Sequence, residues 1–153
     1  MIRAWRFCDT KWADPPLSGE GARLYGGRWN SIGTAVAYTA GSRALATLEV
    51  RVHTEKSVAP MTHVAIEVQI PDEFVLALDA STLPVGWRAY PAPAVLAAFG
   101  DQWVESGESA VLSVPSAVVP EERNYLIHPG HDDFRRIKTL APVRVTYHPR
   151  LFG

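Results

Sequence analysis

The sequence contains a single cysteine, Cys8, among its 153 residues. One cysteine excludes an internal disulfide and a zinc site built from cysteine pairs. Long apolar runs are missing too: nowhere do about 18 uncharged apolar residues follow one another, so no membrane-spanning helix is predicted. Residues 1–6 are interrupted by arginine and lack the apolar core of an export signal. These absences favour a cytoplasmic protein.

An excess of basic charge is also missing. Fifteen Lys and Arg side chains face sixteen Asp and Glu, which gives a net charge of −1. The chain has no basic run of the kind used to bind nucleic acid, so no direct nucleic-acid partner is expected. Repeats and linker-like tracts are absent, and hydrophobic residues make up an ordinary 47%. We therefore predict one compact domain over residues 1–153.

The spacing of apolar residues predicts two helices among several strands. The first helix covers 43–53 behind Ser42, a good N-cap residue, and the second covers 94–104, although Gly100 weakens it. Strands are predicted over 2–7, 35–39, 62–70, 74–78, 110–114, 124–127 and 143–147.

The order of these elements indicates the fold class. Residues 74–78 are expected to pair beside 62–70 across a turn at Pro71, whereas 14–21 and 81–93 are expected to be loops. Most strands follow the first helix, with few β–α–β alternations. This order favours an α+β fold over a doubly wound one.

The first predicted helix places a carboxylate on its apolar face. That face carries Leu45, Leu48 and Val52, and the opposite face carries Arg43, Thr47 and Arg51. At about 100° per residue, Glu49 lies about 40° from Leu45, inside the apolar sector. A carboxylate there needs a partner or a function. An ion pair with Arg43, Arg51 or Arg28 fits this pattern as well as a role in stabilising positive charge.

The densest group of candidate site residues is the segment 25–30, Tyr-Gly-Gly-Arg-Trp-Asn. Its glycines allow a tight turn and close approach to a ligand. Arg28 can bind a phosphate or carboxylate through two parallel hydrogen bonds. Trp29 can wall such a site. A plain hairpin turn with a surface arginine and a core tryptophan explains the same residues, because so short a motif is common.

Ser116 is a third candidate, at the end of the strand predicted over 110–114. A serine turn after a strand is the simpler interpretation. No G-x-S-x-G segment surrounds Ser116, and no histidine is tied to it by sequence, so a hydrolase nucleophile is not expected. If Ser116 has a chemical role, it is that of a hydrogen-bonding group.

The histidines do not form a metal-binding pattern. His128 and His131 flank a Pro-Gly pair, but their spacing matches neither H-E-x-x-H nor a zinc finger. A turn is expected over 128–133, with Asp132 able to cap the next element. His53, at the end of the first helix, is expected to interact with helix carbonyl groups. No metal ligand is predicted.

In their order along the chain, these segments resemble the RES domain, the toxin half of Xre–RES toxin–antitoxin pairs. The family is named for an arginine, a glutamate and a serine, which here match Arg28, Glu49 and Ser116. Other similar positions are Tyr38, Asn124, the opening Trp5-Arg6-Phe7 and the closing Pro149-Arg150-Leu151. The resemblance makes residues 1–153 one RES domain. His128 and His148 depart from the Asn and Asp that are common in the family.

The resemblance implies a fold like that of ADP-ribosyltransferases, with mixed sheets, flanking helices and NAD in a cleft between them. It implies cleavage of the nicotinamide–ribose bond of NAD by phosphorolysis or hydrolysis, with no cofactor beyond NAD as substrate and phosphate as a candidate co-substrate. The alternatives are ADP-ribosylation of a protein and a non-catalytic nucleotide-binding module. The implied partner is an Xre-like antitoxin that blocks the cleft, in a complex that can contain a toxin homodimer.

The resemblance also implies a role for each matched residue. Arg28 would clamp the NAD diphosphate, and Tyr38 would shape the pocket beside nicotinamide. Glu49 would hydrogen-bond the nicotinamide ribose and stabilise the cationic sugar that forms during cleavage. Ser116 would hydrogen-bond the ribose or place the incoming phosphate. Asn124 is counted with the NAD-binding residues, and its main expected role is to orient the loop that carries Ser116.

Overall fold

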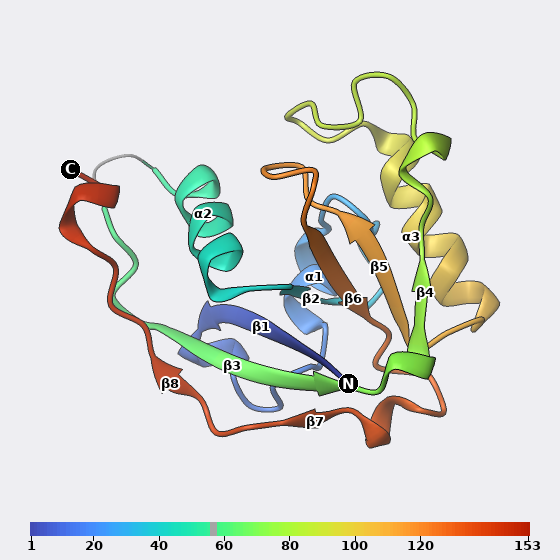
Figure 1. Ribbon diagram of the computed structural model, residues 1–153, viewed down its shortest axis with the longest axis horizontal. Helices are drawn as coiled ribbons and strands as arrows, with labels where there is room; N and C mark the ends of the chain where they lie inside the picture. The colour runs from blue at the N-terminus through green and yellow to red at the C-terminus, as the bar shows by residue number, and fades with distance from the viewer. Residues whose placement is uncertain (56–57) are drawn as a thin grey trace.

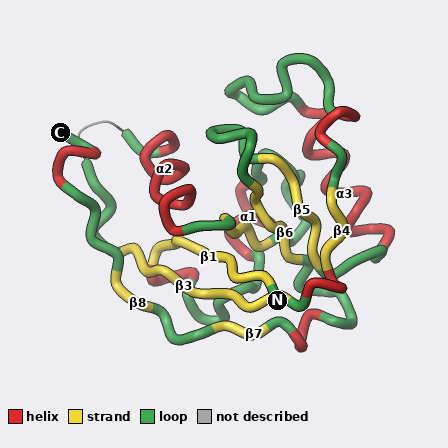
Figure 2. The backbone as a smooth tube through the Cα atoms, in the orientation of Figure 1, coloured by secondary structure: helices red, strands yellow, loops and turns green. Residues whose placement is uncertain are grey.

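The computed structural model describes residues 1–55 and 58–153, which form a curled mixed sheet surrounded by helices (Figure 1, Figure 2). The strands are β1 (Ile2–Asp9), β2 (Ala37–Ala40), β3 (His63–Ile70), β4 (Val75–Ala77), β5 (Val111–Pro115), β6 (Arg123–Ile127), β7 (Lys138–Thr139) and β8 (Val143–Arg144). The α-helices are α1 (Glu20–Tyr25), α2 (Arg43–His53) and α3 (Ala94–Ser106), and 3₁₀ turns cover Thr10–Trp12, Asp72–Phe74, Ala80–Thr82, Phe134–Arg136 and Pro149–Leu151. None of the described helices has the length and apolar character needed to cross a membrane.

The sheet has two parts that meet at a narrow junction. Its order is β4-β5-β6-β2-β1-β3-β7, with β8 also paired to β3. β1 pairs with β3 along its whole length, while β5, β6 and β2 form the second antiparallel part. The two parts join where Trp5 pairs with Ala40. The α+β class is confirmed, and the sheets implied by the resemblance are parts of one hydrogen-bonded sheet.

The prediction that residues 74–78 pair beside β3 is wrong. β3 has β1 on one side and both β7 and β8 on the other, so neither of its edges is free for another neighbour. β4 instead pairs in parallel with β5 at the far end of the sheet, with Val75 opposite Val111. The sequence pattern could not reveal β7, because two residues cannot carry an alternation.

α1 was also unexpected, since it begins at Glu20, inside the segment 14–21 predicted as a loop. It has only six residues, too few to carry the periodicity of a longer helix. It starts after Gly19, whose backbone is left-handed with φ at 68°. α1 leads directly into the segment 25–30 and places it against β2.

α3 packs on the sheet through an apolar cluster that contains Trp29, Leu96, Trp103 and Leu126. Gly100 lies where α3 comes close to the backbone of Trp29. A Cβ atom added there would lie 1.6 Å from the carbonyl oxygen of Trp29. The glycine that weakened the helix prediction is therefore the point where α3 touches the turn that carries Arg28.

Candidate active site

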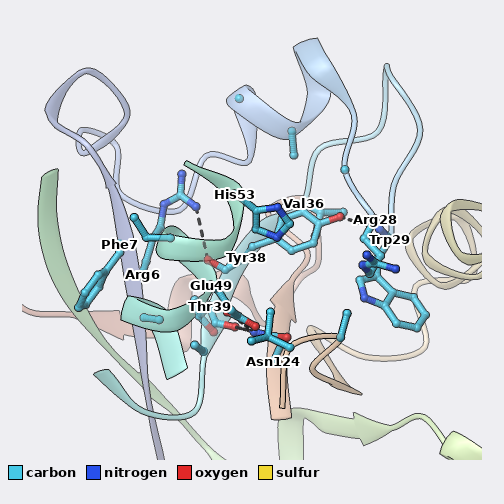
Figure 3. Close-up of a pocket in the computed structure, with 18 of the residues that line it drawn as sticks. Arg6, Phe7, Arg28, Trp29, Val36, Tyr38, Thr39, Glu49, His53 and Asn124 are labelled. Atoms are coloured by element: carbon cyan, nitrogen blue, oxygen red, sulfur yellow. Dashed lines mark hydrogen bonds between the residues drawn. The ribbon is translucent and has the colours of Figure 1, made fainter. Parts of the chain in front are cut away.

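A cavity of about 910 Å³ lies beside α1 and α2, and strands β1, β2 and β6 contribute to its wall (Figure 3). It brings together four of the residues expected to form the site: Arg28, Tyr38, Glu49 and Asn124. Among the described residues that line it, Glu49 is the single carboxylate. The arginines that line it are Arg6 and Arg28. The cavity therefore combines one acid with two permanent cations.

α2 supplies the acid and begins as predicted, because the Ser42 side chain accepts a hydrogen bond from the Leu45 N–H at 3.0 Å. The predicted apolar face is wrong in part: Leu45 is buried, but Leu48 and Val52 are 42% and 59% exposed. The helix packs on Phe7 and Ala40 through Leu45 and Ala46. The face turned to the cavity carries Ala46, Glu49, Val50 and His53. This rotation brings Glu49 to the middle of the inward face.

Both carboxylate oxygens of Glu49 accept hydrogen bonds. Ser116 Oγ donates to Oε2 at 2.9 Å, and Asn124 Nδ2 donates to Oε1 at 2.9 Å. Burial raises the pKa of Glu49, and the charge of Glu122 adds to this effect, while the hydrogen bonds from Asn124 and Ser116 oppose it. Glu49 is thus a fixed carboxylate held by neutral donors.

The ion pairs considered for Glu49 are not formed, since no described cation pairs with it. The Arg43 guanidinium lies 6.0 Å from the centre of the Phe7 ring, and that of Arg51 lies 5.2 Å from the Phe152 ring. These arginines contact aromatic rings on the other side of α2. The charge of Glu49 therefore remains available to a ligand.

Ser116 lies behind Glu49, with no exposed surface, and does not line the cavity. Its hydroxyl donates to Glu49 and accepts hydrogen bonds from the N–H groups of Val118 and Val119 at 3.1 and 3.2 Å. Direct contact of Ser116 with ribose or phosphate, as expected from the resemblance, is incompatible with this position. Its hydroxyl instead holds the carboxylate of Glu49 from behind the cavity wall.

Asn124 on β6 also holds the acid. Its side-chain amide donates to Glu49 and to the carbonyl oxygen of Thr39, at 2.9 and 3.2 Å. The expectation that Asn124 mainly orients the Ser116 loop is therefore wrong. Its hydrogen bond fixes Glu49, and its place in the cavity wall also allows contact with a ligand.

Arg28 lies at the tip of a tight turn in which Gly27 pairs with Asn30, and Trp29 beside it is buried. Its two terminal nitrogens donate to the carbonyl oxygens of Trp87 and Ala89, at 2.8 and 3.1 Å. Burial lowers the pKa of Arg28, yet a guanidinium remains charged at neutral pH. Arg28 thus faces the cavity while it fastens the loop of residues 84–91 to the turn.

Tyr38 connects this turn to β2. Its hydroxyl donates to Asn30 Oδ1 at 2.7 Å and accepts from the Trp29 N–H at 3.0 Å. Burial raises the pKa of Tyr38 well above its ordinary value, so the phenol stays neutral. Tyr38 therefore fixes the position of the Arg28 turn in addition to lining the cavity.

The cavity also contains two residues that the sequence analysis named without giving them a role in the site, Arg6 and His53. Arg6 lies on the same face of β1 as the buried Ala4 and Cys8, so an arginine at an inward strand position was the available signal. His53 follows Glu49 by four residues and shares its helix face. Its ring is 6.0 Å from that of Tyr90, and burial, with the charge of Arg28, lowers its pKa.

The turn over 128–133 uses its histidines locally. His128 Nδ1 accepts the Gly130 N–H at 3.2 Å, and His131 Nδ1 accepts the Asp133 N–H at 3.0 Å. Within the described part of the chain, no group of three or more His, Cys, Asp or Glu residues is arranged to hold a metal ion.

The groups of the cavity suit a substrate with positive charge at one end and negative charge at the other. A buried carboxylate stabilises a cation more strongly than one in water, because the local dielectric constant is low. Arginines bind phosphate groups through paired hydrogen bonds. The arrangement is thus fitted to chemistry in which positive charge develops on a phosphorylated molecule.

The chain is similar to known proteins in sequence and in fold. The family model described as RES domain matches residues 3–148. Prs ADP-ribosylating toxin of Sphingobium sp. is 46% identical over 138 residues, covering 88% of this chain and 86% of that protein. Toxin Res of Yersinia enterocolitica is 38% identical over 135 residues, covering 88% and 89%. A chain in the crystal structure of the Mycobacterium tuberculosis MbcT–MbcA toxin–antitoxin complex has a similar fold, with a TM-score of 0.78 and 20% identity, covering 99% of this chain and 86% of that one.

Proposed function

Because this chain belongs to the RES-domain family, we propose that it is the toxin of a toxin–antitoxin pair and that it cleaves the nicotinamide–ribose bond of NAD. One observation carries the proposal. Glu49 is the single carboxylate among the described residues of the cavity wall, and two neutral donors hold it without a competing cation. This is the group that a sugar cation requires.

The reaction breaks the bond between C1 of the ribose and the nitrogen of nicotinamide. Both electrons leave with nicotinamide, which departs as a neutral molecule, and positive charge remains on the sugar. Glu49 hydrogen-bonds the ribose and stabilises this charge, while Ser116 and Asn124 keep the carboxylate in place. Arg28 stabilises the diphosphate and Tyr38 shapes the nicotinamide pocket. A lone pair of the acceptor oxygen then forms the new bond to C1.

Phosphate and water are the first acceptors to consider, and either would deplete NAD. Phosphate gives a phosphorylated ADP-ribose, whereas water gives ADP-ribose and a proton. A protein acceptor is the second candidate. It is favoured by the name of the 46% identical relative, an ADP-ribosylating toxin.

Incubation of the purified chain with NAD tests the proposal and separates the acceptors. We expect the chain to release nicotinamide in the presence of phosphate or of water alone. Chromatography detects the released nicotinamide. Free products support depletion of NAD, while label from NAD on a protein in a cell extract supports ADP-ribosylation. NAD binding with no turnover under any of these conditions would leave a non-catalytic binding module.

The proposed partner is an Xre-like antitoxin that covers the cavity. Tyr25 and Tyr90 line the cavity and are 75% and 82% exposed. Exposed aromatic side chains of this kind are frequent in protein interfaces. If the antitoxin covers the cavity, both tyrosines should be protected from solvent in the complex. A toxin homodimer within that complex stays a prediction.

Activity should fall on acidification at a higher pH than the ordinary glutamate pKa of about 4.3 would give. Burial raises the pKa of Glu49, so the carboxylate is protonated and loses its charge sooner. Since the charge of Glu122 contributes to the shift, Glu122→Gln should move the acid limb of kcat/KM to lower pH. Glu121→Gln is the control, and equal profiles for all three proteins would refute this assignment.

The same shift has a consequence for stability. A folded-state pKa above the unfolded value means that Glu49 contributes most to the free energy of unfolding below its unfolded pKa. This contribution is lost as the pH rises through the folded pKa. The catalytic form of Glu49 is thus the form that the fold tolerates less well.

Ser116→Ala should lower kcat by about 10- to 100-fold, the effect of losing a hydrogen bond to a charged group. It should also move the acid limb to higher pH, because the Ser116 hydrogen bond lowers the pKa of Glu49. Ser113→Ala removes another buried serine, which binds Arg123 instead, and should leave the limb in place. An unshifted limb in Ser116→Ala would contradict a positioning role.

A further inference from the structure

Arg88 lies in the loop of residues 84–91 and reaches the chain that follows β5. Its guanidinium donates hydrogen bonds to the carbonyl oxygens of Ala117 and Val118, through Nε at 2.9 Å and Nη2 at 3.3 Å. In Figure 1 the loop that carries Arg88, in yellow-green, lies next to the orange loop that follows β5. Arg88 is exposed and does not line the cavity. It therefore contacts the site from outside, through the main chain directly after Ser116.

Arg88 and Ser116 bind the same two peptide groups, those that join Ala117 to Val118 and Val118 to Val119. Each peptide group gives its carbonyl oxygen to Arg88. Each also donates its N–H to Ser116 Oγ, with nitrogen–oxygen distances of 3.1 and 3.2 Å. Both peptide bonds are trans, and the C=O and N–H of a planar trans peptide group point in opposite directions. Arg88 and Ser116 therefore lie on opposite sides of this segment and fix it between them.

The hydrogen bonds continue from Ser116 to the carboxylate of Glu49. Ser116 Oγ donates to Oε2 of Glu49 at 2.9 Å. A chain of hydrogen bonds thus runs from a guanidinium, through two peptide groups and one hydroxyl, to the acid. Hydrogen bonds in series polarise one another, so a group that accepts a hydrogen bond becomes a better donor. The positive charge of Arg88 therefore strengthens the hydrogen bond that Glu49 receives.

Arg28 fixes the backbone from which this chain of hydrogen bonds begins. Its two terminal nitrogens donate to the carbonyl oxygens of Trp87 and Ala89, the residues directly before and after Arg88. The Trp87 side chain also packs against the apolar cluster of α3. The main chain that carries Arg88 is therefore held on both sides, although the arginine itself is exposed.

We propose that Arg88 is a positioning residue for Glu49, which acts on the carboxylate through the main chain of residues 117–119 and the hydroxyl of Ser116. The inference rests on the proposed function for the reaction that Glu49 serves. It joins Arg28, Ser116 and Glu49 in one network that passes through Arg88, outside the cavity.

Titration of Glu49, followed by NMR with isotope-labelled glutamate side chains, tests this without catalysis. The Glu49 signal is identified by its absence in Glu49→Gln. We expect Arg88→Met to raise the pKa of Glu49, because the Ser116 hydrogen bond that lowers this pKa becomes weaker. The kcat for nicotinamide release should fall about 3- to 10-fold, the usual effect of one weakened hydrogen bond. Arg144→Met removes an exposed arginine of β8 and is the matched control, with the titration and rate of the wild type.

Two further variants test the connection through Ser116. Arg88→Lys keeps the charge but loses the paired donors, so it should shift the Glu49 titration in the same direction by a smaller amount. In a Ser116→Ala background, Arg88→Met should cause no further shift, because the connection is already broken. The other acidic and basic groups beside Glu49 are the same in all of these proteins, namely Glu122 and the cavity residues Arg6, Arg28, His53 and His63.

Three results would overturn the inference. They are a wild-type titration of Glu49 in Arg88→Met, a wild-type titration in Arg88→Lys, and a shift of equal size with and without Ser116. The last two would reduce Arg88 to a distant charge that acts through space. The expected titrations in a protein that releases no nicotinamide would instead contradict the proposed function alone.

Discussion

Glu49→Gln is expected to lower the rate of nicotinamide release by about 10²- to 10³-fold, the usual cost of removing one group that stabilises charge in a transition state. The substitution keeps the size of the side chain and one oxygen for Ser116 or Asn124. It removes the negative charge that, in the proposed function, faces the ribose. Because Arg6 and Arg28 are untouched, NAD should still bind with a similar dissociation constant.

Two measurements complete this test. Nicotinamide release gives kcat, and calorimetry with NAD gives the affinity, so that loss of catalysis is separated from loss of binding. Glu67→Gln is a suitable control, since this carboxylate on β3 pairs with Arg3 and does not line the cavity. A Glu49→Gln protein that releases nicotinamide at the wild-type rate would return Glu49 to a purely structural role.

The second large effect is expected at Gly100. Glycine to alanine within a helix normally stabilises a protein by up to about 1 kcal/mol. Here the new Cβ would meet the carbonyl oxygen of Trp29 at 1.6 Å, and a backbone atom cannot turn aside as a side chain can. We expect Gly100→Ala to destabilise the fold by about 3 kcal/mol or more. This corresponds to a fall in Tm of about 6–12 °C.

The neighbouring position Ala98 is exposed on the same helix and provides the opposite control. Ala98→Gly should cost about 1 kcal/mol, through helix propensity alone. Thermal unfolding followed by circular dichroism compares the two variants. Because α3 would have to move away from the Arg28 turn, Gly100→Ala should also have lower activity than the wild type at temperatures where it is still folded. An unchanged Tm would show that α3 can shift without cost.

Local signals in the sequence predicted the local parts of the fold. Ser42 identified the start of α2 correctly, because an N-cap acts within one turn of helix. The alternation over 62–70 identified β3 and its buried face for the same reason. The orientation of α2 was less predictable: its contacts with Phe7 and Ala40 turn Leu48 away from the core, and nothing within the helix encodes those contacts.

The candidate site shows the same division between local and distant information. Glu49 drew attention because it lies on an inward face, a property of its own helix. Its bonds to Ser116 and Asn124 depend on how β5 and β6 enter the sheet. The family resemblance named Ser116 and Asn124, but only the folded chain reveals that both act on Glu49. Arg6 was named only as part of a family-like segment and was given no role in the site, although its inward strand position carried the signal.

The spacing of this triad along the chain has a consequence for the cell that makes the protein. Glu49 is synthesised early, whereas its two partners follow 67 and 75 residues later. A nascent chain that ends before β6 has the acid but lacks Asn124, one of the two groups that hold it. Interrupted translation products should therefore be harmless, and an antitoxin has to meet only finished molecules.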